Sequence, residues 1–131
     1  MALSDNVNHP DHYTMSMPAV QIECIDFSRN MSFCQGNAFK YVWRAGHKDD
    51  AVEDLQKAIW YLQRATVYSM GTYLLHQWEY VHEKLFNTLS PVGKRRLNIL
   101  NEIIQQDYKQ AITLIEEWIT DFKKDEVTNN D

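Results

Sequence analysis

Apolar residues recur every three or four positions along most of the chain, a spacing typical of amphipathic helices. The spacing predicts helices over residues 18–30, 33–45, 51–70 and 72–89, and two more that begin at Pro91 and near Asp107. Only four glycines and three prolines occur, which leaves little room for the frequent turns of an all-β protein. We therefore expect an all-α fold with five or six helices.

The chain divides into four segments of a single domain, as expected for 131 residues. Residues 1–17 are polar and show no period, so they predict an extended N-terminal arm. Residues 18–71 form a motif-bearing helical core, and residues 72–124 form a C-terminal helical scaffold of the same domain. We expect residues 125–131 to be a frayed tail.

Residues with capping or helix-ending preferences mark the helix ends in the core segment. Ser32 is expected to cap the second helix, and Gly46 to end it. Either Asp49 or Asp50 caps the third helix, which we expect to end at Gly71. A short charged turn therefore joins the second and third helices.

Composition and charge disfavour some classes of function for this protein. The chain is 44% hydrophobic and 24% charged, as in an ordinary soluble protein, and its net charge of −5 argues against a general nucleic-acid binder. No apolar run approaches the roughly 18 residues of a membrane span, and the first ten residues lack the pattern of a signal peptide. Cys24 and Cys34 lack the spacing of a disulfide framework or a zinc knuckle. We expect a cytoplasmic protein without nucleic-acid or membrane partners.

A basic stripe runs along the second predicted helix. At about 100° per residue, Asn37, Lys40, Tyr41 and Arg44 fall within an arc of roughly 100°. Lys48 joins them only if the helical path continues that far. This stripe predicts a site for an anion, most naturally phosphate. The alternative is a solvated amphipathic face, which periodicity alone favours.

Two other groups of polar residues flank this stripe. Glu23 and Asp26 lie three positions apart, a spacing that suits a metal ion, a ligand hydroxyl or a neighbouring cation, and equally an ordinary surface pair. On the third predicted helix, Asp54, Lys57 and Tyr61 belong to a polar stripe that we expect to lie off the core.

The N-terminal arm carries His9, His12 and Tyr13 around a proline. Two histidines three apart bind a metal only with a further ligand, such as His47. A contact with phosphate, or with a base bracketed by His and Tyr, is an equal alternative. A leader with incidental histidines is the simplest interpretation.

Several enzyme signatures are absent. The sequence holds no GxxxxGK[ST], GxGxxG, GxSxG or HExxH pattern. Any phosphate must therefore be bound by side chains on helices and not by a glycine-rich loop. Lys94, Arg95 and Arg96 form a basic run, which is more typical of a solvated surface than of a second phosphate site.

Three blocks in order, VNHPDHY, ECIDF and GNAFKYVWRAGHKDDAVEDLQKAIWYL, carry a resemblance to known proteins. They resemble a family of small bacteriophage proteins described as SaV-like and of unknown function. Some of its members are described as nucleotide kinases because they are similar to a phage enzyme that phosphorylates deoxynucleoside monophosphates without a Walker motif. The resemblance covers Val7 to Leu62, and residues 72–131 carry no motif of it.

The resemblance implies a phage enzyme that phosphorylates deoxynucleoside monophosphates. It implies a nucleoside triphosphate as phosphate donor and leaves the need for Mg²⁺ open. Lys40, Arg44 and Asp26 are then the expected catalytic residues, Arg44 as a bidentate partner of phosphate. The expected substrate-binding residues are His9, His12, Tyr13, Glu23, Asn37, Tyr41, Lys48, Asp54 and Lys57. No metal ligands are assigned.

Two alternative functions compete with the kinase. A helical, Mg²⁺-dependent nucleotide pyrophosphohydrolase would use clustered carboxylates, for which Glu23, Asp26, Glu53 and Asp54 are candidates. A non-catalytic nucleotide-binding or host-inhibiting phage protein would use the same basic stripe without turnover.

The aromatic content predicts a homo-oligomer. Four tryptophans and seven tyrosines occur in the chain, and several are offset from the apolar stripes. Aromatic side chains left outside a core are enriched at subunit contacts. The residues concerned are Trp60, Tyr61, Tyr68, Tyr73 and Tyr80. The expected setting is the cytoplasm of an infected bacterium, where the resemblance places the protein.

Overall fold

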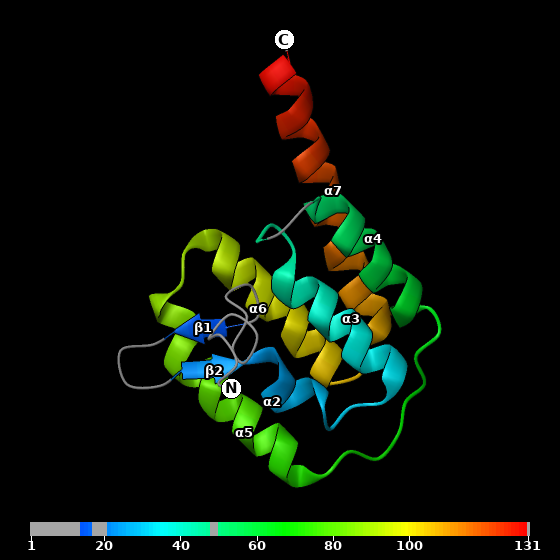
Figure 1. The fold of residues 1–131 in the computed structure, drawn as a ribbon, viewed down its shortest axis with the longest axis vertical. Coiled ribbons are helices and arrows are strands. Elements are labelled where there is room, and N and C mark those ends of the chain that lie inside the picture. The colour runs from blue at the N-terminus through cyan, green and yellow to red at the C-terminus, as the bar shows by residue number, and fades with distance from the viewer. Residues whose placement is uncertain (1–13, 17–20, 48–49, 131) are drawn as a thin grey trace, which may run out of the picture.

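A computed structural model describes residues 14–16, 21–47 and 50–130, and their backbone is mostly helical (Figure 1). Two short strands precede six α-helices and one 3₁₀ turn in this part of the chain. The elements are β1 (Thr14–Ser16), β2 (Gln21–Glu23), α2 (Cys24–Ser28), α3 (Phe33–Arg44), α4 (Ala51–Leu62), α5 (Thr72–Leu85), η2 (Phe86–Thr88), α6 (Pro91–Ile104) and α7 (Tyr108–Asn130). The all-α prediction is confirmed.

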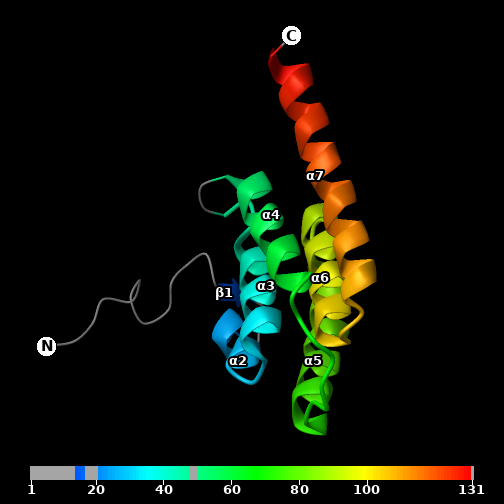
Figure 2. The same ribbon diagram turned by 90° about the vertical axis from the view of Figure 1, so that its right-hand side faces the viewer.

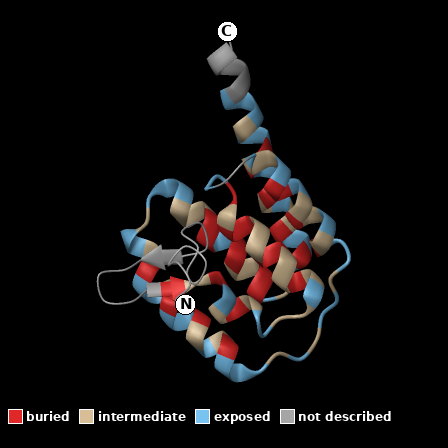
Figure 3. Cartoon of the chain, viewed as in Figure 1, coloured by how far each residue is buried: buried red, intermediate tan, exposed pale blue. Residues whose placement is uncertain are grey.

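The helices form two layers around one core. Figure 2 shows α2, α3 and α4 on one side, and α5, α6 and α7 on the other. Helix α3 packs against α2 and α4 within its layer and against α6 across it, and α4 packs against α7. Figure 3 shows the buried positions concentrated in the middle of the molecule. The core includes Phe27, Phe39, Val42, Leu55, Ala58, Leu74, Trp78, Leu97, Leu100, Ile103, Ala111, Ile115 and Trp118.

An aromatic group joins the two layers. The ring of Phe27 meets that of Trp78 edge-on at 5.2 Å, and Phe39 contacts both Trp43 and Trp78. The Trp78 indole N–H donates to Asn101 Oδ1 at 3.0 Å, so its polar atom is satisfied inside the core. This group fixes α2 and α3 on α5 and α6.

The structure corrects the first predicted helix. Residues 14–16 and 21–23 are antiparallel strands with Met15 opposite Ile22, and α2 begins only at Cys24. Ile22 is buried, so part of the apolar spacing serves a strand. A short apolar run does not discriminate between the 3.6-residue period of a helix and the two-residue period of a strand. The expected start at Pro18 lies outside the described residues.

Helix α3 has the predicted boundaries at both ends, and α4 begins where predicted. Ser32 is the N-cap residue of α3, although its side chain makes no capping bond, and Gly46 follows the helix with a φ of 87°. The Asp50 carboxylate accepts the backbone N–H groups of Val52 and Glu53 and so caps α4.

Helix α4 is shorter than predicted, because it ends at Leu62 and not at Gly71. The segment that follows is held by side chains from other elements. Gln106 pairs with the backbone of Tyr68: Tyr68 N–H donates to Oε1 and Nε2 donates to Tyr68 O, both at 2.8 Å. These bonds replace the ones that a helix would have provided.

The C-terminal scaffold starts its helices where the sequence predicts. Ser90 caps α6 with Pro91 in its first turn, and the Asp107 carboxylate accepts the Gln110 N–H before α7. Helix α7 continues to Asn130, beyond the end that we expected at residue 124, and projects past the other helices (Figure 1). None of the described helices has the length and apolar character needed to cross a membrane.

Candidate functional site

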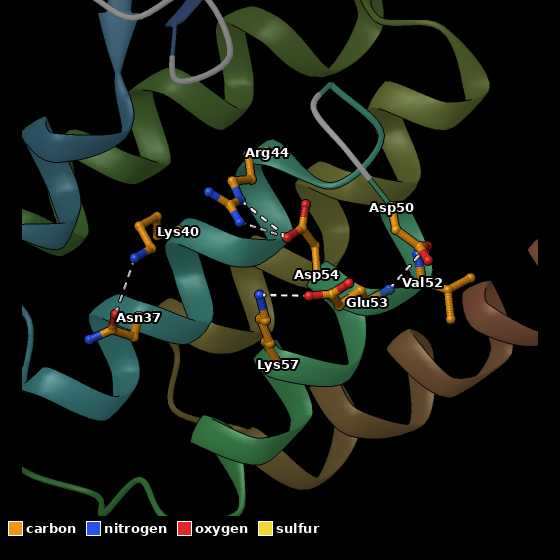
Figure 4. Close-up of polar contacts among 8 residues, drawn as sticks. All are labelled: Asn37, Lys40, Arg44, Asp50, Val52, Glu53, Asp54 and Lys57. Atoms are coloured by element: carbon orange, nitrogen blue, oxygen red, sulfur yellow. Dashed lines mark hydrogen bonds and ion pairs between the residues drawn. The ribbon is translucent and has the colours of Figure 1, made fainter.

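The basic stripe is present on α3, and Figure 4 shows how its side chains lie. Lys40 Nζ donates to Asn37 Oδ1 at 3.3 Å, while Asn37 Nδ2 donates to the Phe33 carbonyl at 2.8 Å. The amide of Asn37 is thus held by its own helix and in turn orients Lys40.

Tyr41 lies at the centre of three cations. Lys40 Nζ is 4.6 Å from the centroid of its ring, Arg44 Cζ is 4.9 Å away, and Lys57 Nζ, which comes from α4, is 5.5 Å away. We call Lys40, Arg44 and Lys57 the cationic cluster. A ring face attracts each cation, but the three repel one another, so the cluster favours a bound anion.

Arg44 forms a largely buried ion pair with Asp54. Its Nε and Nη2 donate to Asp54 Oδ1 at 3.2 and 2.9 Å, and the Asp54 side chain is 2% exposed. The expectation that Asp54 lies off the core is therefore wrong. The guanidinium compensates the desolvation of the carboxylate and makes burial tolerable. Asp54 Oδ2 is buried as well and accepts no hydrogen bond from the described residues.

The two lysines of the cluster differ in their partners. Lys57 pairs with Glu53 at 2.9 Å in solvent, and this hydrogen bond raises the pKa of Lys57 above its ordinary value. No carboxylate of the described residues lies within 4.0 Å of Lys40 Nζ. Among the described residues, these three cations and the two carboxylates that pair with them carry a net charge of +1, in a protein of net charge −5.

Glu23 and Asp26 are occupied with starting a helix. The Glu23 N–H donates to Asp26 Oδ2 at 2.9 Å, and the Glu23 side chain accepts the Asp26 N–H in a reciprocal capping box. Asp26 also acts through space on the buried Cys24 thiol, as does Lys40. Asp26 belongs to α2, which packs against α3.

Four residues of the predicted site lie outside the described part of the chain. They are His9, His12, Tyr13 and Lys48. Their roles in binding phosphate, a base or a metal stay predictions.

The candidate carboxylates of a pyrophosphohydrolase do not gather. Among the described residues, no three Asp, Glu, His or Cys side chains approach closely enough to hold a metal ion. Glu53 and Asp54 pair with Lys57 and Arg44, whereas Glu23 and Asp26 cap α2. The four carboxylates therefore divide between the two ion pairs and the start of α2.

Two buried polar residues that support the site were missed by the sequence analysis. Gln35 is fully buried, and its Nε2 donates to the Ile103 carbonyl at 3.0 Å while its Oε1 accepts the Tyr68 hydroxyl. The Tyr68 oxygen also accepts the Ser32 N–H at 3.1 Å. The signal was available: Gln35 lies four positions before Phe39, on the apolar stripe of α3.

Arg96 is the second such residue, and the structure corrects its assignment to a solvated run. It is 5% exposed and donates from Nη1 to Trp43 O at 2.5 Å and from Nη2 to Ala45 O at 2.6 Å. These carbonyls end α3, where the helix carries partial negative charge. Burial lowers the pKa of Arg96 to about 10. Its neighbour Arg95 does lie nearer the surface, paired with Asp121 at 2.8 Å.

Comparison with known proteins adds one finding about this region. The model of a family described as a protein of unknown function, DUF3310, matches residues 7–63. The match takes in the three motif blocks and helices α2, α3 and α4, so the cationic cluster lies inside it. No curated protein and no solved structure matches the chain.

Proposed function

We propose that this protein binds nucleotides at the cationic cluster and transfers a phosphoryl group from a nucleoside triphosphate to a deoxynucleoside monophosphate. The products would be a nucleoside diphosphate and a deoxynucleoside diphosphate. The observation that carries the proposal is the convergence of Lys40, Arg44 and Lys57 on Tyr41 from two helices. Phosphoryl transfer asks mainly for positioning and charge neutralisation, which such a cluster can supply.

The partners of the three cations assign them different roles. Lys57 is held by a solvent-exposed pair with Glu53, which water and salt weaken, whereas a charge-assisted hydrogen bond to phosphate is among the stronger polar contacts. Phosphate therefore competes successfully for Lys57, and at Lys40 it meets no rival carboxylate from the described residues. Breaking the buried Arg44–Asp54 pair costs about 3–5 kcal/mol. Arg44 thus keeps Asp54 and contributes its charge while it holds α3 and α4 together.

The test is incubation of the purified protein with dTMP or dGMP and a nucleoside triphosphate, with the products separated by chromatography. A deoxynucleoside diphosphate supports the kinase. Pyrophosphate with a monophosphate made from the triphosphate supports the hydrolase instead. Binding without any new product indicates a non-catalytic nucleotide-binding protein.

Lys40→Ala is the matched variant for this assay. Loss of one charge-assisted contact should lower nucleotide binding or turnover about tenfold or more, with helicity by circular dichroism unchanged. Lys123→Ala, on the exposed face of α7, should change neither. Wild-type activity in Lys40→Ala would rule out the cationic cluster as the phosphate site.

We also propose that the protein is a homo-oligomer acting in the cytoplasm of an infected bacterium. The support for assembly is the exposure of Tyr73 and Tyr80, at 76% and 54%, which lie seven positions apart on α5 and so share a face. Aromatic side chains on one exposed face are typical of subunit contacts.

A further inference from the structure

An aromatic surface continues from the cationic cluster along the seam between α3 and α4. The rings of Tyr41 and Tyr61 stack at 6.0 Å, and Tyr61 meets Phe33 edge-on at 5.9 Å and Trp60 at 5.1 Å. Phe33 is 74% exposed and Trp60 is 51% exposed. Neither the Phe33 ring nor the Trp60 ring is buried in the core. Each contacts Tyr61, and Tyr61 contacts Tyr41.

Phe33 also lines a hollow of about 230 Å³. Phe33 and Lys40 both line it, with Asn37 between them, and residues of α2 and the α2–α3 turn form the opposite wall. The wall residues are Ser28, Met31 and Ser32. The Ser32 hydroxyl oxygen is buried and has no hydrogen-bond partner among the described residues, although buried polar atoms are normally paired. The hollow thus combines a flat apolar ring with a lysine that no described carboxylate approaches.

The order of these groups matches the order of the parts of a nucleotide. Phe33 and Lys40 are seven residues apart on one helix, about 10 Å at 1.5 Å per residue, which is comparable with the span from base to phosphate in a nucleoside monophosphate. Aromatic rings bind bases by stacking whatever their sequence, because every base has a π-face. The Tyr61 ring contacts the Phe33 ring at an angle of 73° and limits its freedom.

We infer that Phe33 is the stacking platform for the base of a nucleoside monophosphate whose phosphate lies at Lys40. This inference rests on the proposed function and assigns the acceptor nucleotide to the hollow between α2 and α3. The sugar then lies between Phe33 and Lys40, beside Asn37. The remaining cations of the cluster, on the α4 side of Tyr41, are left for the donor phosphates.

The test compares dTMP and inorganic pyrophosphate as calorimetric probes of the full-length chain and its variants. Phe33→Ala should weaken dTMP binding about 5- to 150-fold, equivalent to roughly 1–3 kcal/mol for one stacked base, and leave pyrophosphate binding unchanged. Phe33→Tyr should bind dTMP as the wild type does. Val67→Ala removes an equally exposed apolar side chain and should have no effect. Lys40→Ala should weaken both ligands.

The two proposals fail in different ways. Equal dTMP affinity in Phe33→Ala and the wild type would overturn the stacking platform and leave the cationic site standing. Equal losses for dTMP and pyrophosphate would overturn it too, because Phe33 would then be structural. A change of mass by light scattering without a dTMP-specific loss would assign Phe33 to a contact between copies. A wild-type chain that binds neither probe would refute the proposed function itself.

Discussion

At the scale of single residues, the basic stripe holds cations of two kinds. Lys40 on α3 is bonded to an amide oxygen of its own helix, whereas Arg44 is 16% exposed and bound to a carboxylate of the next helix. Two residues on the same face of α3 thus have different roles. Lys40 is a candidate phosphate-binding residue, and Arg44 holds α3 and α4 together. Substitutions at the two positions should have different consequences.

Arg44→Ala should destabilise the fold as well as the site. It leaves Asp54 buried without its counter-charge, which costs about 3–5 kcal/mol. Urea unfolding followed by circular dichroism measures this loss. The double variant Arg44→Met and Asp54→Leu should recover most of the stability, because it removes both charges together. A single variant as stable as the wild type would show that the pair contributes little.

Cys24 should make stability fall in alkaline solution. Burial raises the pKa of its thiol from 9.0 to about 12, so between those values the unfolded chain loses this proton while the folded chain keeps it. The unfolded state is then favoured, by about 2 kcal/mol at pH 10.5 relative to pH 8. Tyr108, whose pKa is raised to about 12 by burial, adds a loss of the same sign above pH 10.

Urea midpoints at pH 8, 9.5 and 10.5 measure the effect. Cys24→Ala should flatten the dependence of stability on pH, whatever its effect at pH 8. Identical slopes in Cys24→Ala and the wild type would show that the thiol does not carry the linkage.

At the scale of elements, the segment after α4 shows how a distant side chain holds a non-helical stretch. Gln106 has a φ of 62°, unusual for a residue with a side chain, and its amide pairs with both backbone groups of Tyr68. Tyr68 in turn holds Ser32 and Gln35 at the start of α3. The N-terminal turn of α3, beside Phe33, therefore depends on contacts that begin at the end of α6.

Gln106→Ala should lower the unfolding free energy by about 2–3 kcal/mol, because two hydrogen bonds are lost and their partly buried backbone partners are left unpaired. Gln106→Gly loses the same bonds but relieves the left-handed backbone, so it should be about 1 kcal/mol more stable than the alanine variant. Thermal and urea unfolding of the three proteins measure both differences. Equal stability of wild type and alanine variant would contradict this role.

At the scale of the whole molecule, the aromatic residues offset from the apolar stripes divide into two groups. Tyr61 and Tyr68 are partly buried and make internal contacts, so the structure gives them roles that do not require a partner subunit. Trp60, Tyr73 and Tyr80 remain exposed by half or more. This smaller group therefore supplies the support for assembly.

Light scattering at micromolar concentration should give a mass that is a multiple of 15.5 kDa. Replacing Tyr73 and Tyr80 together by alanine should shift the mass towards one chain, since both lie on one exposed face of α5. Replacing the exposed Val92 by alanine is the matched control and should preserve the mass. A wild-type mass near 15.5 kDa would refute the assembly.

The sequence by itself determined the helical class, the caps of α3, α4 and α6, and the residues of the basic stripe. These features are local: a capping residue stands next to the helix that it begins, and a helix face needs only a fixed rotation per residue. The order of residues alone therefore places Lys40, Tyr41 and Arg44 on one side of α3.

Only the tertiary structure decided which partners the polar side chains contact. Asp54 became buried because Arg44 approaches from another helix, and Arg96 because the carbonyls that end α3 accept its guanidinium. Gln106 found its partner because Tyr68 lies beside it. The free energy of burying these charges is set by partners 10 to 53 positions away in the chain. The periodicity of a sequence predicts which residues share a helix face, but it does not predict what packs against that face.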